Sequence, residues 1–421
     1  MLREREFRLL WLGGSLSSIG DALIPVATAF AVLELGTATD LGIVLGAYMF
    51  GRFVFTLLGG VWADRLPRRL IMIASDAVRA AVQAVIALAF LTDAIEVWHL
   101  AVSSVIFGSA GAFFGPASTG LIPQIVSPGR LQEANALLGV SRNAIELFGP
   151  AAAGAIVATA GYAVIYIVDA ASFVASLVCL ALMRPLGAAQ KRAQSFLADV
   201  REGVHEVLAR PWMRATLTAD LFANFAIAPY FVLGPLVVRE HLSGASDWGL
   251  MMAAGAAGGI AGGALVLRWK PKRLLVAAYC VLIAIPLSLL SLVPPLPLPL
   301  LMLGAAALTF SIVVGNTFWT TAEQQHIPNE VLGRVDSVSW MVSIAIMPLA
   351  FAVAGPVADA IGVRNALYIA AAIGVASSAG ALLSRGVREL QRLEDEPTPT
   401  PEVFGAEGEV LPVPVQPAPV P

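Results

Sequence analysis

Residues 59–69 read Gly59-Gly60-Val61-Trp62-Ala63-Asp64-Arg65-Leu66-Pro67-Arg68-Arg69. An apolar run from Leu41 leads into this stretch, and a second apolar run leads out of it as far as Leu91. Between the two runs lie one carboxylate, three guanidinium groups and a turn-forming proline. Because Lys and Arg concentrate in the cytoplasmic loops of membrane proteins, the stretch predicts a hairpin of two membrane helices with a cytoplasmic tip.

The composition of the whole chain agrees with a membrane protein. Of the 421 residues, 58% are hydrophobic and 13% are charged, and the mean hydropathy is +0.80. Soluble domains are about 25% charged, so we expect an all-α protein that crosses the membrane many times. Twelve apolar segments have spanning length, at 9–35, 41–63, 70–91, 97–122, 134–159, 163–184, 214–238, 247–267, 273–293, 298–321, 332–357 and 364–384.

The positions of Lys and Arg predict how these segments are oriented. With a cytoplasmic amino terminus, 21 of the 26 basic residues fall in termini and loops on the cytoplasmic side. The loops on the other side contain only Arg239 and Arg364. This bias predicts that both termini are cytoplasmic. We expect a multi-pass protein of the cell's inner (plasma) membrane.

The chain is predicted to consist of two related halves and two accessory segments. Pro67-Arg68-Arg69-Leu70 recurs as Pro271-Lys272-Arg273-Leu274, and Gly129-Arg130-Leu131 recurs as Gly333-Arg334-Val335, both 204 residues later. The repeat indicates a duplicated six-helix unit, with one half at 1–184 and the other at 214–385. Residues 185–213 form a linker with an amphipathic helix, and the tail at 386–421, with eight Pro and seven acidic residues, is expected to be disordered in the cytoplasm.

Asp21 is the first candidate for coupling transport to protons. It follows Arg8 by about 20 Å of helix, so it lies well inside the bilayer. No Lys or Arg lies within a turn of it along the chain, and a carboxyl group in such a place could load and release a proton. The other interpretation is a structural hydrogen bond to Ser17, to Ser18 or to a neighbouring helix.

Three further charged residues inside predicted helices are candidates for proton coupling. Arg142 and Glu146 are four residues apart, which places them on one helix face and favours an internal ion pair. Alternatively, binding of substrate or of a proton breaks that pair during transport. Arg52 has no local partner, so we expect it to meet Asp21 or Glu146 across the bundle. Asp21 and these three residues are the proton-coupling candidates.

Other charged residues in the predicted helices are expected to have structural roles. Asp76 and Arg79 are three residues apart at the inner end of a predicted helix, which favours a structural pair near the membrane interface. Asp169 and Asp220 each lie about six residues from a predicted helix end, so we expect them to reach toward the interface or to form hydrogen bonds at the helix end.

Several of these motifs resemble the major facilitator superfamily of transporters. The spacing Gly-x-x-x-Asp-Arg-x-x-Arg-Arg, here Gly60, Asp64, Arg65, Arg68 and Arg69, is similar to the loop between helices 2 and 3 of that family, with Pro67 where the family usually has glycine. Gly149-Pro150 followed by Gly154 resembles the helix-5 element of its antiporters, which is associated with export. Residues 112–137 look like the branch that contains the enterobactin exporter and the macrolide efflux proteins.

The resemblance implies a twelve-helix secondary transporter of the major facilitator fold. We expect proton-coupled export of an amphipathic small molecule, such as a drug, a secondary metabolite or a siderophore, by alternating access. The alternatives are an importer or facilitator of a small metabolite and a non-transporting membrane receptor. The sequence has no nucleotide-binding loop, nucleophile motif or His/Cys cluster. We therefore expect no enzyme activity, no metal, no cofactor and no nucleic-acid partner, and we expect a monomer in the lipid bilayer.

The 59–69 loop also carries a hypothesis about conformational switching. At the 204-residue offset, Asp64 corresponds to Arg268, so the acid is present in only one half. We predict that Gly60 lets helix 2 pack against helix 11 while Asp64 meets the amino-terminal end of helix 11 near 333–336. That contact would close the cytoplasmic side. If the loop served only topology, its arginines would suffice without Asp64.

Overall fold

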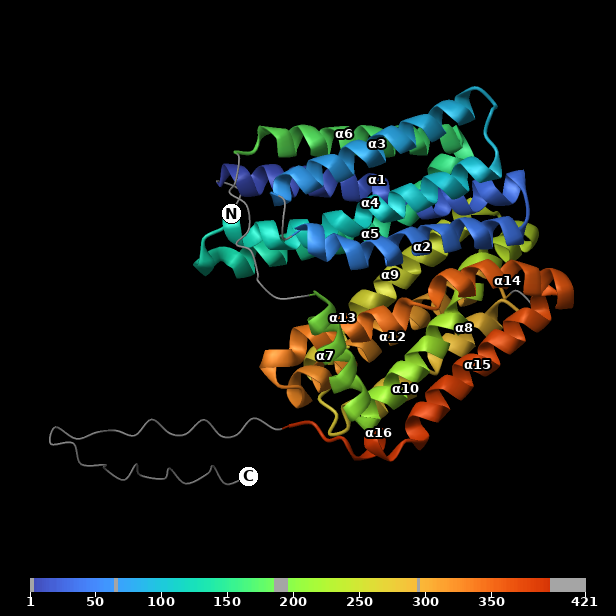
Figure 1. The fold of residues 1–421 in the computed structure, drawn as a ribbon. Coiled ribbons are helices and arrows are strands. Elements are labelled where there is room, and N and C mark those ends of the chain that lie inside the picture. The colour runs from blue at the N-terminus through green and yellow to red at the C-terminus, as the bar shows by residue number, and fades with distance from the viewer. Residues whose placement is uncertain (1–3, 64–66, 185–195, 294–295, 394–421) are drawn as a thin grey trace, which may run out of the picture.

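The computed structural model describes residues 4–63, 67–184, 196–293 and 296–393 of the chain. Twelve stretches of helix in this part of the chain are long and apolar enough to cross a membrane, which confirms the predicted all-α class (Figure 1). The first six are α1 (Arg5–Leu35), α2 (Ala38–Ala63), α3 (Arg68–Leu91), α4 (Val97–Ile125), α5 (Leu131–Ala160) and α6 (Tyr162–Leu182). The second six are α8 (Pro211–His241), α9 (Ala245–Arg268), α10 with α11 (Leu274–Val281 and Ala284–Ser291), α12 (Leu298–His326), α13 with α14 (Asn329–Ile344 and Met347–Ile361) and α15 (Val363–Leu383).

Two of the predicted spans are interrupted helices. The segment predicted at 273–293 consists of α10 and α11, and the segment predicted at 332–357 consists of α13 and α14. Pro286 and Pro348 lie in the first turns of α11 and α14. Proline lacks a backbone N–H and sterically opposes the preceding turn, which explains why each span breaks just before it.

Close helix packing repeats in the two groups of six. In the first group, α2 packs against α4, with Gly51 against the Val105 carbonyl and Gly108 against the Tyr48 carbonyl. In the second group, α9 packs against α12 in the same way, with Gly258 against the Ala306 carbonyl. A side chain at these glycines would collide with backbone. Small residues allow membrane helices to approach this closely, and close packing is a main source of their association.

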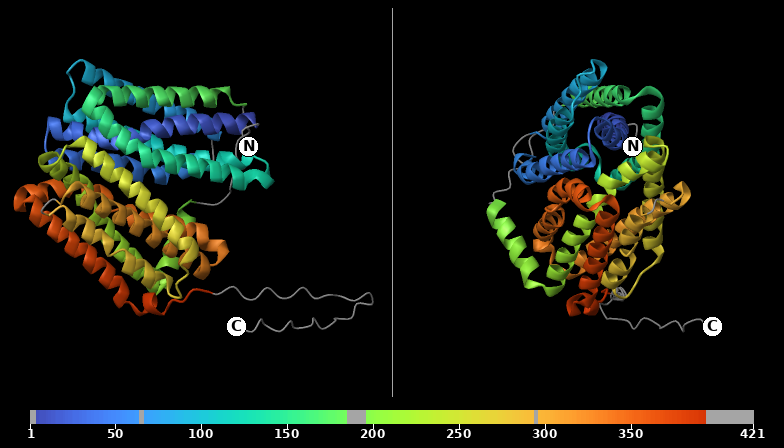
Figure 2. Two further views of the ribbon diagram at one scale, coloured as in Figure 1. Left: turned by 180° about the vertical axis from the view of Figure 1, so that it is seen from behind. Right: turned by 90° about the vertical axis from the view of Figure 1, so that its right-hand side faces the viewer.

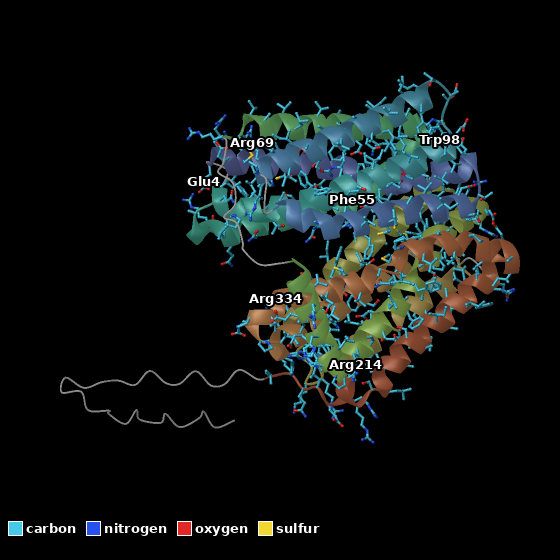
Figure 3. The ribbon with its side chains drawn as sticks, viewed as in Figure 1. Glu4, Phe55, Arg69, Trp98, Arg214 and Arg334 are labelled. Atoms are coloured by element: carbon cyan, nitrogen blue, oxygen red, sulfur yellow. The ribbon has the colours of Figure 1, made fainter. Side chains whose placement is uncertain are left out.

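The bundle has two ends, which we call the terminal face and the distal face. The terminal face contains the start of α1, the start of α3 and the end of α15; the distal face contains the turns at 36–37, 92–96 and 242–244. Glu4 and Arg69 lie at the terminal end of the first group and Trp98 lies at its distal end (Figure 3). Two further short helices, α7 (Phe196–Ala209) and α16 (Arg385–Glu389), lie at the terminal end of the second group (Figure 1). Glu202 of α7 forms an ion pair with Arg334 of α13 at 2.9 Å.

The two groups converge toward the distal face and diverge toward the terminal face (Figures 1 and 2). On the distal side, Gly42 of α2 packs against the Phe351 carbonyl of α14, and the Thr39 hydroxyl donates a hydrogen bond to Asp359 at 2.6 Å. One apolar cluster there includes residues of both groups. Toward the terminal face the apolar core divides into two clusters, one confined to each group. Tight packing between the groups is therefore a distal feature.

Candidate functional site

The first group contains a set of polar side chains that we call the carboxylate cluster, made of the buried Asp76, Arg79, Gln83 and Asp169 and the partly exposed Asp21. Arg79 of α3 contacts Asp76 at 2.6 Å and Asp21 of α1 at 3.6 Å. Gln83, one turn further along α3, donates a hydrogen bond to Asp169 of α6 at 2.6 Å. The cluster therefore joins α1, α3 and α6 through polar contacts inside the bundle.

Asp21 is thus not the isolated carboxylate that its sequence neighbourhood indicated. Its cation comes from α3, which is distant in the chain and adjacent in space. The Asp76–Arg79 pair, which the sequence favours as a structural pair near the membrane interface, is buried: Asp76 is 0% exposed and Arg79 is 5% exposed. Asp169 is also 0% exposed, so its carboxylate does not reach out of the membrane as expected for an acid close to a helix end.

Aromatic rings hold the Arg79 guanidinium in place. Its carbon atom lies 4.3 Å from the ring centre of Phe173 and 4.7 Å from that of Phe114, distances typical of cation–π contacts. Asp76 also accepts a hydrogen bond from the Ser176 hydroxyl at 2.6 Å. The Arg79–Asp76 pair is consequently fixed from α3, α4 and α6 together.

The three carboxylates differ in their access to solvent. The side chain of Asp21 is 37% exposed, whereas Asp76 and Asp169 are fully buried. Gly20, beside Asp21, packs directly against Asp169 and Ser172, so α1 and α6 touch where the acids meet. The arrangement has three acidic groups and one basic group, and an unbalanced charge is costly within the hydrocarbon. Asp21 is therefore the acid of the cluster that is open to exchange with its surroundings.

Among the described residues, the remaining proton-coupling candidates form no ion pair with the acids of this cluster. Arg142 and Glu146 form the ion pair expected from their spacing, at 2.7 Å, with side chains 76% and 52% exposed. Arg52 donates a hydrogen bond to the Tyr48 hydroxyl at 3.2 Å, one turn back on α2. It forms no direct ion pair with Asp21 or Glu146, but its charge acts on Asp21 across the bundle, so Asp21 stays its predicted partner.

The helix-5 element lies against both groups of helices. Gly149 packs against Ala22 of α1, and the Pro150 carbonyl lies against Gly249 of α9. Gly154 packs against the backbone at Ala245, where α9 begins. These residues therefore form the joint between α5 and α9 on the distal side.

The residues of the 59–69 loop are only partly described by the structure. Gly60 lies in the last turns of α2, whereas Asp64 and Arg65 lie outside the described residues. Arg68 donates a hydrogen bond to the Gly120 carbonyl of α4. Arg69 donates to the Leu180 and Ala181 carbonyls, each at 2.7 Å, at the carboxyl end of α6, where free carbonyls favour a cation.

The second group contains a cavity of about 320 Å³ that the sequence does not reveal. We call it the C-half cavity; it lies between α8, α10, α11, α12 and α13, and its lining includes Asp220, Tyr279, Trp319, Asp336 and Trp340. The Tyr279 hydroxyl donates a hydrogen bond to Asp220 at 2.9 Å. Asp220, like Asp169, was expected to act only at a helix end, and the structure instead places it at this cavity.

One signal for the carboxylate cluster is present in the sequence. Asp76, Arg79 and Gln83 follow one another at spacings of three and four, so they form a polar stripe on one face of an otherwise apolar helix. Such a stripe inside a membrane segment indicates a functional interior face. Among the residues that the structure describes, no three His, Cys, Asp or Glu side chains are arranged to hold a metal ion.

Comparison with known proteins agrees with this architecture. The family model described as Major Facilitator Superfamily matches residues 10–343. The chain is 29% identical over 367 residues to the multidrug efflux pump Tap of Mycolicibacterium fortuitum, covering 82% of this chain and 87% of that protein. It is 24% identical over 371 residues to the macrolide efflux protein A of Streptococcus pyogenes, covering 86% of this chain and 91% of that protein.

Solved structures share the fold. A bacterial homologue of the iron transporter ferroportin in an inward-facing state superposes with a TM-score of 0.69 and 18% identity, covering 90% of this chain and 98% of that one. A bacterial homologue of the human lysosomal transporter Spinster, inward-facing and unoccupied, gives a TM-score of 0.65 and 17% identity, covering 93% and 98%. The twelve-helix architecture and the family match over most of its length identify this chain as a multi-pass membrane transporter, not an enzyme, of the major facilitator superfamily.

Proposed function

We propose that this transporter exports an amphipathic small molecule from the cell in exchange for protons. The observation that carries the proposal is the carboxylate cluster, in which Arg79 pairs with two of the three acids and only Asp21 has a partly exposed side chain. Similarity to a multidrug efflux pump and to a macrolide efflux protein supports export and an amphipathic substrate.

The proposed orientation places the terminal face in the cytoplasm. Arg5, Arg68, Arg69 and Arg130 lie at the terminal ends of their helices, which fits the tendency of basic residues to remain inside. The described conformation, tightly packed at the distal face, then has its divergent ends toward the cytoplasm. A substrate would enter between the halves from that side, and the α2–α14 and α5–α9 joints would separate to release it outside.

The proton step follows from the geometry of the cluster. When Asp21 is ionised, its carboxylate attracts the Arg79 guanidinium, which also contacts Asp76. A proton on Asp21 removes that attraction, so Arg79 then pairs with Asp76 only. Protonation of one exposed acid therefore changes how strongly α1 is held to α3. We propose that this change links proton binding to the movement between conformations.

Replacement of Asp21 by asparagine tests the proposal. In inside-out membrane vesicles with an imposed pH gradient, Asp21→Asn should abolish gradient-driven transport of a dye or macrolide while the protein inserts at normal levels. Exchange of labelled for unlabelled substrate without a gradient should persist, because this variant removes only the proton step. The matched control is Asp93→Asn, at an exposed turn with φ of 52°, a conformation that asparagine also adopts readily.

The outcome separates the proposal from its alternatives. Undiminished gradient-driven transport in Asp21→Asn would exclude this residue as the coupling group. Transport by the wild-type protein that does not respond to a pH gradient would instead favour a facilitator. Arg52, Arg142 and Glu146 stay predictions as further proton-coupling residues.

Asp64→Asn tests the hypothesis that the 59–69 loop acts as a conformational switch. Normal insertion with normal transport in this variant would leave the loop with a topological role only.

A further inference from the structure

The C-half cavity is large enough for an organic ligand and belongs to one half of the protein. Its volume of about 320 Å³ is at the lower end of the range of small-molecule sites, about 300–1,000 Å³. The lining residues come from α8, from α10 and α11 with the turn between them, and from α12 and α13. The cavity is therefore separate from the carboxylate cluster, which lies between α1, α3 and α6.

The charged groups around the cavity are all acidic. Asp220 lines it from α8 and Asp336 lines it from α13, and no Lys, Arg or His is part of its lining. A third acid, Glu323, lies directly behind the lining residue Ser339, whose hydroxyl donates to it at 3.4 Å. Glu323 is 1% exposed. Such a one-sided distribution of charge in a low-dielectric region attracts cations and repels anions.

The uncharged part of the lining suits an apolar ligand with a cationic group. Two tryptophans, Trp319 and Trp340, line the cavity together with aliphatic side chains such as Ile227 and Leu282. Indole rings provide apolar surface and also attract cations to their faces.

One hydrogen-bond donor at the cavity is unused. The Trp319 indole N–H is buried and has no acceptor among the described residues. The Asn224 side-chain amide, by contrast, already donates to the Ser343 carbonyl at 2.9 Å. Because an unpaired buried donor is costly, Trp319 is suited to a ligand that carries an oxygen acceptor.

We propose that the C-half cavity binds an amphipathic organic cation, with its positive charge between Asp220 and Asp336 and its apolar body against Trp319 and Trp340. The proposal rests on the proposed export function and specifies its substrate class. It also places substrate and proton in different halves of the protein. Coupling would then pass through the relative movement of the halves, and not through competition for one carboxylate.

Equilibrium binding to the purified full-length protein in detergent tests this site. The probe is radiolabelled tetraphenylphosphonium, and the comparison ligand is triphenylmethane, which is uncharged, similar in shape and without a hydrogen-bond acceptor. We expect saturable binding of the cation and at least tenfold weaker binding of the neutral ligand. Asp220→Asn and Asp336→Asn should each weaken cation binding about tenfold or more, whereas Asp93→Asn should bind as the wild type does.

A tryptophan substitution tests the hydrogen-bond donor separately. Trp319→Phe keeps an aromatic face and removes the indole N–H. Tetraphenylphosphonium has no hydrogen-bond acceptor, so its affinity should change less than twofold. Rhodamine 6G, a cation that bears an ester carbonyl, should bind several-fold more weakly to this variant. Trp98→Phe, at an exposed distal tryptophan, is the matched control.

The results distinguish this inference from the function on which it rests. The inference is overturned if tetraphenylphosphonium does not bind saturably, if both asparagine variants keep wild-type affinity, or if the neutral ligand binds equally well. If Asp220→Asn fails to fold, Asp336→Asn decides, because its side chain is exposed and its loss should be tolerated. Cation binding without proton-driven transport would contradict only the proposed function. Proton-driven transport of a neutral compound without cation binding would contradict only this inference.

Discussion

At the scale of single residues, Arg79 organises the first half of the transporter. It contacts Asp21 and Asp76 of the carboxylate cluster directly, and Gln83, one turn further along α3, donates a hydrogen bond to the third acid, Asp169. Two aromatic rings cover its guanidinium at 4.3 and 4.7 Å. Arg142 is a suitable control for Arg79, because it also pairs with an acid on its own helix but its side chain is 76% exposed.

Replacing each arginine by leucine should therefore have very different effects on stability. Arg79→Leu leaves Asp76 buried without its cation, and breaking a buried pair in this way typically costs about 3–5 kcal/mol. Arg142→Leu removes an exposed pair of residues four apart, which is worth about 0.3–0.5 kcal/mol. The free energy of unfolding, measured by titration from mild detergent into dodecyl sulfate, should show this difference. Equal losses in the two variants would mean that the cluster does not contribute to stability through Arg79.

At the scale of helices, the joint between α5 and α9 depends on the absence of side chains. A methyl group at Gly154 would collide with the Ala245 carbonyl, whereas a methyl group at Gly380, on the exposed face of α15, would meet nothing within 4 Å. Overpacking of this kind typically costs about 1–3 kcal/mol. The cost falls on the conformation that is closed at the distal face, so Gly154→Ala should shift the population toward distal opening and Gly380→Ala should not.

A cysteine introduced at a buried position can measure the shift toward distal opening. Val232 is 0% exposed and lies close to Gly42, where α2 meets the second half. In a protein without Cys179 and Cys280, a cysteine at Val232 should react several-fold faster with a membrane-impermeant maleimide when Gly154 is alanine. The label is added from the distal side, and the Gly380→Ala protein provides the reference rate. Identical rates would show that the α5–α9 contact does not hold the distal face closed.

The sequence predicted relations that depend on neighbouring positions and missed those that depend on helix packing. Arg142 and Glu146 were assigned correctly as a pair because a spacing of four fixes their geometry on one helix. The lengths of the apolar segments likewise predicted the twelve membrane-spanning stretches. The Asp21–Arg79 contact could not be inferred, since it requires α1 to pack beside α3 and Gly20 to bring α1 against α6. The C-half cavity could not be predicted either, because its lining comes from five helices whose relative rotation no local pattern specifies.

At the scale of the whole molecule, the two halves are held together on one side of the membrane. The polar contacts between them include the Thr39–Asp359 hydrogen bond at 2.6 Å and a hydrogen bond from Arg239 of α8 to the Leu33 carbonyl of α1. The α2–α14 joint also packs Gly355 against the backbone at Thr39. Transport by alternating access requires this side to open in each cycle. A covalent link across it should therefore stop transport without disturbing either half.

Thr39 and Asp359 are suited to such a link because both are solvent-accessible and their side chains touch. In a protein without Cys179 and Cys280, we expect the Thr39→Cys/Asp359→Cys variant to lose transport when treated with a short bifunctional methanethiosulfonate. A reductant, which cleaves the linker, should restore transport. Each single-cysteine variant treated with the same reagent is the control for modification alone. If the linked protein transports substrate at an undiminished rate, the distal face does not open during the cycle, and the halves must exchange access by a movement that leaves the α2–α14 joint intact.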